Sequence, residues 1–136
     1  MNEKWIASCV LTVMCMSLIS CKGGSPLQKS PGEVVQAYNI ACNEGKYSDV
    51  KVLFSEDVQK MIAGDMGQLA GGIKGVCDKD TRDGTVTKVD IVSQDIRGEG
   101  ATVIATIFFK DGTKKNDDKT VLIKENGAWR ITAGGN

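Results

Sequence analysis

The spacing of the apolar residues changes once along the chain, near Thr85, and this change limits the folds that the chain can adopt. Over residues 30–77, apolar side chains recur every three or four positions, which is the spacing of helices with one buried face. From Thr85 onward, β-branched and polar residues alternate, which is typical of half-buried strands. Helices followed by consecutive strands predict an α+β fold, with N-terminal helices packed on an antiparallel sheet of about four strands.

The helical part has clear local signals. Residues 30–33, Ser-Pro-Gly-Glu, form a capping box with proline at the first helical position, so the first helix begins there. Gly45 ends this helix as a left-handed cap. Two shorter helices are expected near Ser48 and from Ser55. The glycine-rich stretch that follows predicts only a weak helix, over residues 68–77, because each glycine costs about 1 kcal/mol relative to alanine.

The second half predicts a meander of strands joined by tight turns. Asp111-Gly112 and Asn126-Gly127 are typical hairpin turns. The charged residues 114–118 are interpreted as an exposed bend or as protection of a sheet edge. Residues 78–84 lack the ligands that an EF-hand loop needs and predict a solvated turn before the first strand. The strands are expected over residues 86–92, 102–109, 119–124 and 128–132.

The N-terminal segment is typical of a bacterial export signal. Residues 5–19 are 15 apolar or small residues without a charge, too few for a membrane-spanning helix of roughly 20 residues. The tetrapeptide at residues 18–21, Leu-Ile-Ser-Cys, resembles a lipobox, which implies cleavage before Cys21 and a lipid on its sulfur. The alternatives are an uncleaved anchor helix or an ordinary secreted protein. The predicted organisation is a signal peptide (1–20), a lipidated cysteine with a flexible tether (21–29) and an α+β domain (30–136).

Lipidation at Cys21 predicts a chain held at a membrane of the bacterial cell envelope. In enteric lipoproteins, an aspartate directly after the lipidated cysteine favours the inner membrane. This chain has Lys22 at that position, so the resemblance implies the outer membrane, with the domain facing the periplasm.

The composition excludes several classes of function. The 17 basic residues balance the 17 acidic ones, so there is no basic excess of the kind that nucleic-acid binding needs. The chain has no histidine, which removes the commonest metal ligand and the commonest general base. We therefore expect no nucleic-acid partner, no metal site, no cofactor and no catalytic residue.

Two cysteines are left for the folded domain. Cys9 and Cys15 belong to the predicted signal peptide and Cys21 to the lipid anchor, which leaves Cys42 and Cys77. In an oxidising compartment two such cysteines commonly form a disulfide. The alternative is a pair of buried thiols that pack as small apolar groups. The sequence leaves both states open.

Two segments resemble a known family. Residues 30–54 resemble the opening of small nuclear transport factor 2-like lipoproteins, and residues 122–131, Leu-Ile-Lys-Glu-Asn-Gly-Ala-Trp-Arg-Ile, resemble their final hairpin. These proteins belong to a lumazine-binding-like group of largely uncharacterised envelope proteins. Over about residues 30–133, the resemblance implies a curved antiparallel sheet that wraps around helices into a cone with a pocket. The glycine-rich middle of the chain departs from the family pattern.

These observations favour a non-catalytic domain that binds a small apolar ligand or an envelope protein. The expected pocket is lined by five residues: Tyr38, Val103, Ile107, Phe109 and Trp129. The alternative is an enzyme of the isomerase or dehydratase type, which occurs among relatives of this superfamily and needs a buried carboxylate facing a tyrosine. Among its candidate groups, Tyr38 is expected in the core and Asp90 on the solvent face of a strand. A structural or assembly role at the membrane is a third hypothesis.

Overall fold

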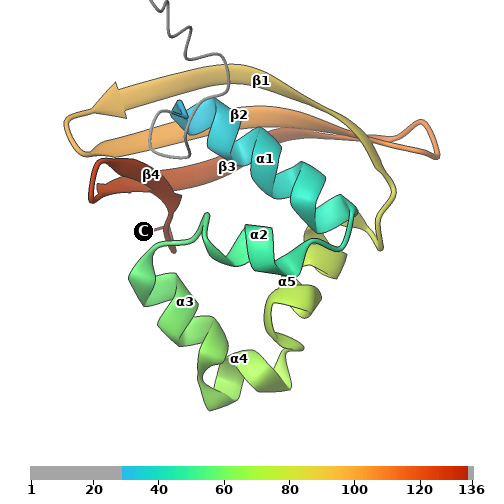
Figure 1. The fold of residues 1–136 in the computed structure, drawn as a ribbon. Coiled ribbons are helices and arrows are strands. Elements are labelled where there is room, and N and C mark those ends of the chain that lie inside the picture. Colours follow the sequence, from blue (N-terminus) through green and yellow to red (C-terminus); the bar gives the residue numbers. More distant parts are fainter. Residues whose placement is uncertain (1–28, 135–136) are drawn as a thin grey trace, which may run out of the picture.

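The computed structural model describes residues 29–134 and has the order expected from the sequence, helices first and strands second (Figure 1). The predicted signal peptide, Cys21 and all but the last residue of the tether lie outside the described residues. No helix within residues 29–134 combines the length and the apolar character needed to cross a bilayer. The described elements are α1 (Pro31–Asn43), α2 (Tyr47–Lys51), α3 (Glu56–Ala63), α4 (Asp65–Leu69), α5 (Gly72–Thr81), β1 (Val86–Arg97), β2 (Gly100–Phe109), β3 (Lys114–Glu125) and β4 (Ala128–Ile131).

The four strands form one antiparallel sheet in the order β1-β2-β3-β4, which confirms the predicted α+β class. β1 and β3 are each 12 residues long, because β1 continues past residue 92 and β3 starts at Lys114 instead of residue 119. β2 alternates buried and half-buried residues along its whole length, so one face of it forms the floor of the core. That inner face carries Ala101, Val103, Ala105, Ile107 and Phe109.

α1 packs on the inner face of β1 and β2, and Figure 1 shows the sheet bending over it. The predicted capping box is present, because the Glu33 amide donates to Ser30 Oγ and the Ser30 amide donates to the Glu33 carboxylate. At the other end, the Asn43 side chain donates to the Val86 carbonyl and accepts from the Val86 amide. α1 is therefore fixed at both ends, and it buries eight of its 13 residues.

The glycine-rich stretch forms two helices instead of the single weak helix expected over residues 68–77. α4 and α5 are separated at Gly71, whose φ of +90° is in the left-handed region that favours glycine. A Cβ on Gly75 would lie 2.0 Å from the Ala70 carbonyl oxygen, so this position needs glycine for a close backbone approach. The helix prediction was wrong in its boundaries because these glycines allow a sharp break between two well-formed helices.

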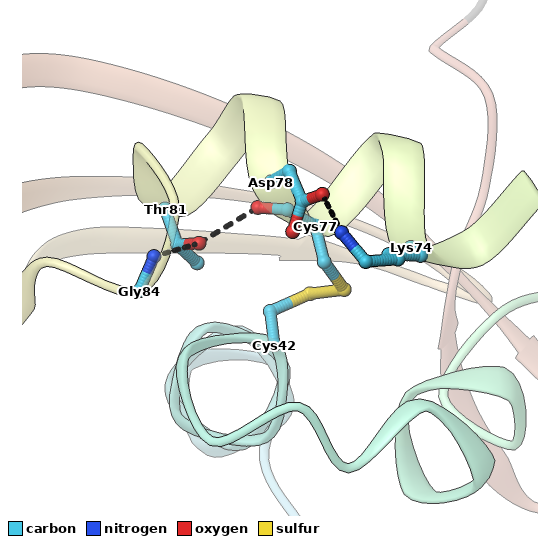
Figure 2. A network of polar contacts seen from close by, with 6 residues as sticks. All are labelled: Cys42, Lys74, Cys77, Asp78, Thr81 and Gly84. Atoms are coloured by element: carbon cyan, nitrogen blue, oxygen red, sulfur yellow. Dashed lines mark hydrogen bonds and ion pairs between the residues drawn. A yellow bond between two sulfur atoms is a disulfide. The ribbon is translucent and has the colours of Figure 1, made fainter. Parts of the chain in front are cut away.

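α5 continues into the segment that the sequence predicted as a solvated turn. Residues 78–81 form its last turn, and only residues 82–84, all with positive φ, form the connection to β1. The Thr81 hydroxyl donates to the Cys77 carbonyl and accepts from the Gly84 amide, which ends the helix (Figure 2). This last turn of α5 matters for the site because it places Asp80 on a helix that faces α1.

Candidate functional site

A cavity of about 600 Å³ lies between α3, α5, the start of β3 and the segment that follows β4. Its walls are mainly apolar on the helical side and polar on the side of β3. The apolar lining comes from Phe54, Val58, Met61, Ile62, Val76, Val121 and Ile131, and the polar lining from Tyr38, Asp80, Lys115, Asp118, Lys119, Thr120 and Thr132.

Tyr38 and Asp80 form a hydrogen-bonded pair in this cavity. The Tyr38 hydroxyl donates to Asp80 Oδ2 over 2.7 Å, and its ring packs edge-on against Phe54 at 5.6 Å between centroids. Only 7% of Tyr38 is exposed. Burial raises the pKa of the Tyr38 hydroxyl far above its usual value, and the negative charges of Asp80 and Asp118 raise it further. Tyr38 is therefore a neutral phenol at physiological pH, with its proton engaged by Asp80.

A disulfide between Cys42 and Cys77 joins the same two helices, α1 and α5, with their Cα atoms 4.9 Å apart (Figure 2). Of the two states that the sequence left open, the structure has the disulfide. Tyr38 precedes Cys42 by four residues and Asp80 follows Cys77 by three, so each lies about one turn from the disulfide on its own helix. The disulfide and the Tyr38–Asp80 hydrogen bond are thus neighbouring links between α1 and α5, and the disulfide supports the geometry of the pair.

A bulge in β3 turns two charged residues toward the cavity. Asp118 pairs with Ala105 and Lys115 pairs with Ile107, so three steps along β3 match two steps along β2. Asp117, inside the bulge, has a φ of +55°. Because Ala105 and Ile107 are both on the inner face of β2, the bulge places Asp118 and Lys115 on that face together. Lys115 Nζ forms an ion pair with Asp118 Oδ1.

Of the five residues predicted to line the pocket, the structure places Tyr38 at this cavity and the other four elsewhere. Val103 lies fully buried in the main core with α1, and Trp129 lies in the same core. Ile107 and Phe109 form a smaller cluster with Val86. The prediction identified the correct face of β2, but α1 packs on that face and fills the space. The cavity is therefore displaced to the neighbouring strand, β3.

The sequence did not reveal the charged residues of the cavity. It predicts Asp80 in a solvated turn, and Lys115 and Asp118 in an exposed bend or as protection of a sheet edge, whereas all three line the cavity. The sequence carries no local signal for them, because neither the bulge in β3 nor the extension of α5 past residue 77 follows from a residue pattern. Asp90, one of the carboxylates considered for catalysis, forms an ion pair with Lys88, and its side chain is 45% exposed. Among residues 29–134, no three acidic, cysteine or histidine side chains are grouped as metal ligands.

Comparison with known proteins places the domain in a group without an assigned role. A family model described as "Domain of unknown function (DUF4878)" matches residues 21–132. No curated protein matches the chain.

Two solved structures share the fold. One is a protein from Campylobacter jejuni named as a candidate NTF2-like transpeptidase, with a TM-score of 0.60 and 16% identity, over 78% of this chain and 100% of that one. The other is a SEC-C motif-containing protein from Rhodopseudomonas palustris, with a TM-score of 0.56 and 14% identity, over 82% of this chain and 80% of that one. At these identities the similarity establishes the fold alone.

Proposed function

Since the chain belongs to the DUF4878 family of domains of unknown function and has an NTF2-like fold, we propose that it is a non-catalytic envelope lipoprotein whose cavity binds a small, largely apolar ligand. The observation that carries the proposal is the cavity of about 600 Å³ between α3, α5 and β3. Ligand pockets of this size, with apolar walls and a few convergent polar groups, commonly hold small molecules.

The Tyr38–Asp80 pair bears on the choice between binding and catalysis. An isomerase or dehydratase needs a carboxylate base and a donor that both face the substrate. In this cavity the tyrosine hydroxyl donates a hydrogen bond to the carboxylate itself, over 2.7 Å, so the donor and the carboxylate are engaged with each other and not with a substrate. The pair therefore favours a binding site over a catalytic one. The same two residues are the carboxylate and the tyrosine that the enzyme hypothesis requires.

A direct test measures binding of the neutral apolar dye N-phenyl-1-naphthylamine, whose fluorescence rises on leaving water. The predicted mature chain, residues 21–136 with Cys21→Ser, is used, so that neither the apolar signal peptide nor a lipid or detergent takes up the dye. The variant Ile62→Glu adds a charge to a half-buried wall residue and is expected to weaken dye binding about tenfold or more. The control Val92→Glu, at an exposed position on β1 outside the cavity, is expected to bind normally. Equal dye binding by wild type and Ile62→Glu would rule out this cavity as the site.

The membrane anchor is the second part of the proposal and rests on the sequence. The family match begins at Cys21, so the 20 preceding residues lie outside the family domain, which fits a signal peptide removed at this point. A thioether-linked diacylglycerol with an outer-membrane location facing the periplasm follows from the lipobox and from Lys22.

The anchor is tested by labelling cells with radioactive palmitate and separating membranes from the soluble fraction. Cys21→Ser is expected to lose the label and to leave the membranes. Cys15→Ser, a cysteine of the same segment outside the lipobox, serves as the matched control and is expected to keep both. A labelled or fully membrane-bound Cys21→Ser protein would contradict the proposed anchor.

A further inference from the structure

The polar end of the cavity carries two carboxylates, Asp80 and Asp118, and two ammonium groups, Lys115 and Lys119. Lys115 pairs with Asp118, whereas Asp80 is held by the neutral Tyr38 hydroxyl. The proton of Tyr38 is engaged by Asp80 Oδ2, which leaves the phenol oxygen as an acceptor. Within residues 29–134, Tyr38 is the one side chain found hydrogen-bonded to the Asp80 carboxylate, so its Oδ1 is available to a ligand. A carboxylate has room for about four hydrogen bonds, and this one uses few of them.

Asp118 adds a second carboxylate to the same end. Tyr38, Asp80 and Asp118 all line this cavity, and the charge of Asp118 adds to burial and to Asp80 in raising the pKa of the Tyr38 hydroxyl. Asp118 is the more deeply placed member of its ion pair, because its side chain is 18% exposed and that of Lys115 is 47% exposed. A mostly buried carboxylate needs a cation beside it, but the half-exposed Lys115 ammonium can move into solvent when another ammonium takes its place. A ligand ammonium can therefore replace Lys115 at Asp118.

From this arrangement we infer that the cavity is built for a small molecule with an apolar body and a primary ammonium group, which Asp80 and Asp118 bind in place of the Lys115 ammonium. This inference rests on the proposed function and specifies its ligand class. The three N–H donors of an ammonium group can bond to two carboxylates and a phenol oxygen. Its positive charge takes the place of the Lys115 charge. The apolar body then lies against Phe54, Val58 and Ile62.

Other ligand classes fit the polar end less well. A carboxylate ligand would be repelled by Asp80 and Asp118, and only the exposed Lys119, or Lys115 released from Asp118, could offset that repulsion. An alcohol can donate one hydrogen bond, but it brings no charge to balance the carboxylate from which Lys115 is displaced. The discriminating quantity is therefore the affinity of an amine relative to an alcohol and an acid with the same alkyl chain.

The experiment displaces N-phenyl-1-naphthylamine from the mature Cys21→Ser chain with octylamine, 1-octanol or octanoate at pH 7. We expect octylamine to act at roughly tenfold lower concentration than 1-octanol, and octanoate to be the weakest of the three. Asp118→Asn and Asp80→Asn are each expected to reduce the amine preference severalfold, measured as the ratio of the octylamine and 1-octanol concentrations that displace half of the dye. Lys115→Gln, which removes the competing ammonium, is expected to strengthen octylamine binding. The control Asp90→Asn changes a carboxylate outside the cavity and is expected to have no effect.

The outcomes separate this inference from the proposed function. If the dye binds in an Ile62-dependent way but octanoate displaces it as well as octylamine does, the cavity binds ligands and the ammonium assignment is wrong. If Asp118→Asn and Asp80→Asn both keep the full amine preference, the assignment is also wrong. If the dye does not bind in the cavity, the proposed function and this inference fail together.

Discussion

The two sides of the cavity are held in place very differently. On one side, α1 buries eight of its 13 residues and packs on β2, which buries every second residue along its length. On the other side is the segment of residues 56–69, α3 and α4, which we call the helical arm. The arm buries Val58 and no residue of α4, while Met61, Met66 and Leu69 are between 60% and 84% exposed.

The polar groups and the apolar wall of the cavity come from different sides. The polar groups of the site, Tyr38, Asp80 and Asp118, come from α1, α5 and β3, which are tied together by the disulfide and the sheet. The apolar wall formed by Val58 and Ile62 comes from the arm. Segments with few buried contacts open at low free-energy cost, whereas core elements open only with global unfolding. For the proposed ligand, the polar groups are therefore held on rigid elements, and the apolar wall lies on a segment that can adjust.

Among these predictions, removing the disulfide is expected to have the largest effect on the free energy of unfolding. Cys42 and Cys77 are 35 residues apart, and closing a loop of that length stabilises a fold by roughly 4 kcal/mol. The double variant Cys42→Ala/Cys77→Ala should lose about this much free energy of unfolding, measured by urea denaturation. Hydrogen exchange should rise more in α5 than in β2, because α5 loses its covalent link to α1.

Reduction provides the control for this prediction. A reductant should destabilise the wild-type chain by a similar amount and leave the double variant unchanged. If the double variant is as stable as the oxidised wild type, the link between α1 and α5 does not depend on the disulfide.

A leucine-to-alanine substitution on each side shows how much the packing of that side contributes to the free energy of unfolding. Leu122 on β3 is fully buried, and Leu69 on α4 is 84% exposed. Leu122→Ala should cost about 3 kcal/mol in the free energy of unfolding, since it removes buried methyl groups and leaves a cavity. Leu69→Ala should cost less than about 0.5 kcal/mol. Similar losses at the two positions in urea denaturation would show that the arm is packed in solution against a surface that the structure leaves open.

A third prediction concerns the junction between the arm and α5. Gly75→Ala would place a Cβ 2.0 Å from the Ala70 carbonyl oxygen, so the break between α4 and α5 must shift, at a cost of roughly 2 kcal/mol. Gly64→Ala is the matched control, because Gly64 has an ordinary extended backbone and its nearest atom would be 3.5 Å away. Thermal unfolding of both variants measures the difference. A fully stable Gly75→Ala protein would mean that the close approach is not required.

The periodic elements could be predicted from the sequence because each is determined by local chemistry. The capping box at residues 30–33 and the alternation of β2 are local patterns, and both are present in the structure. The break at Gly71 could not be placed, because five glycines in 13 residues allow a break at several positions. Glycine content indicates a weak helix but does not show at which residue the helix breaks.

The site was harder to predict because it depends on tertiary packing. Val103 has the pattern of a pocket residue, and only the position of α1 shows that its space is already filled. Asp118 reaches the inner face through a bulge that changes the strand period by one residue. Asp80 meets Tyr38 because α5 runs one turn further than its glycine-rich start suggests. None of these three features is a local property of the residue concerned.

The smallest expected effect concerns the N-terminal caps of α1 and α4, which lie on opposite sides of the comparison. The N-terminus of α1 has a capping box, whereas α4 begins at Gly64 without a side-chain cap. The Ser30 backbone amide, which donates to Glu33 Oε2 over 2.7 Å, and the Ser30 hydroxyl hold the pKa of the Glu33 carboxyl below its usual value. Ionised Glu33 therefore stabilises the fold above the unfolded-state pKa of about 4.3, and this contribution is lost as the pH falls through the folded-state pKa.

Glu33→Gln should consequently be slightly less stable than wild type at pH 7. The difference should shrink as the pH is lowered from about 5 and disappear once Glu33 is protonated in the folded state. Urea denaturation over a pH series measures it. Ser30→Ala, which removes the hydroxyl cap, should cost about 1 kcal/mol at neutral pH. A Glu33→Gln difference that stays constant with pH would show that the ionised carboxylate is not what the cap recognises, and the contrast between the start of α1 and the uncapped α4 would then rest on Ser30 alone.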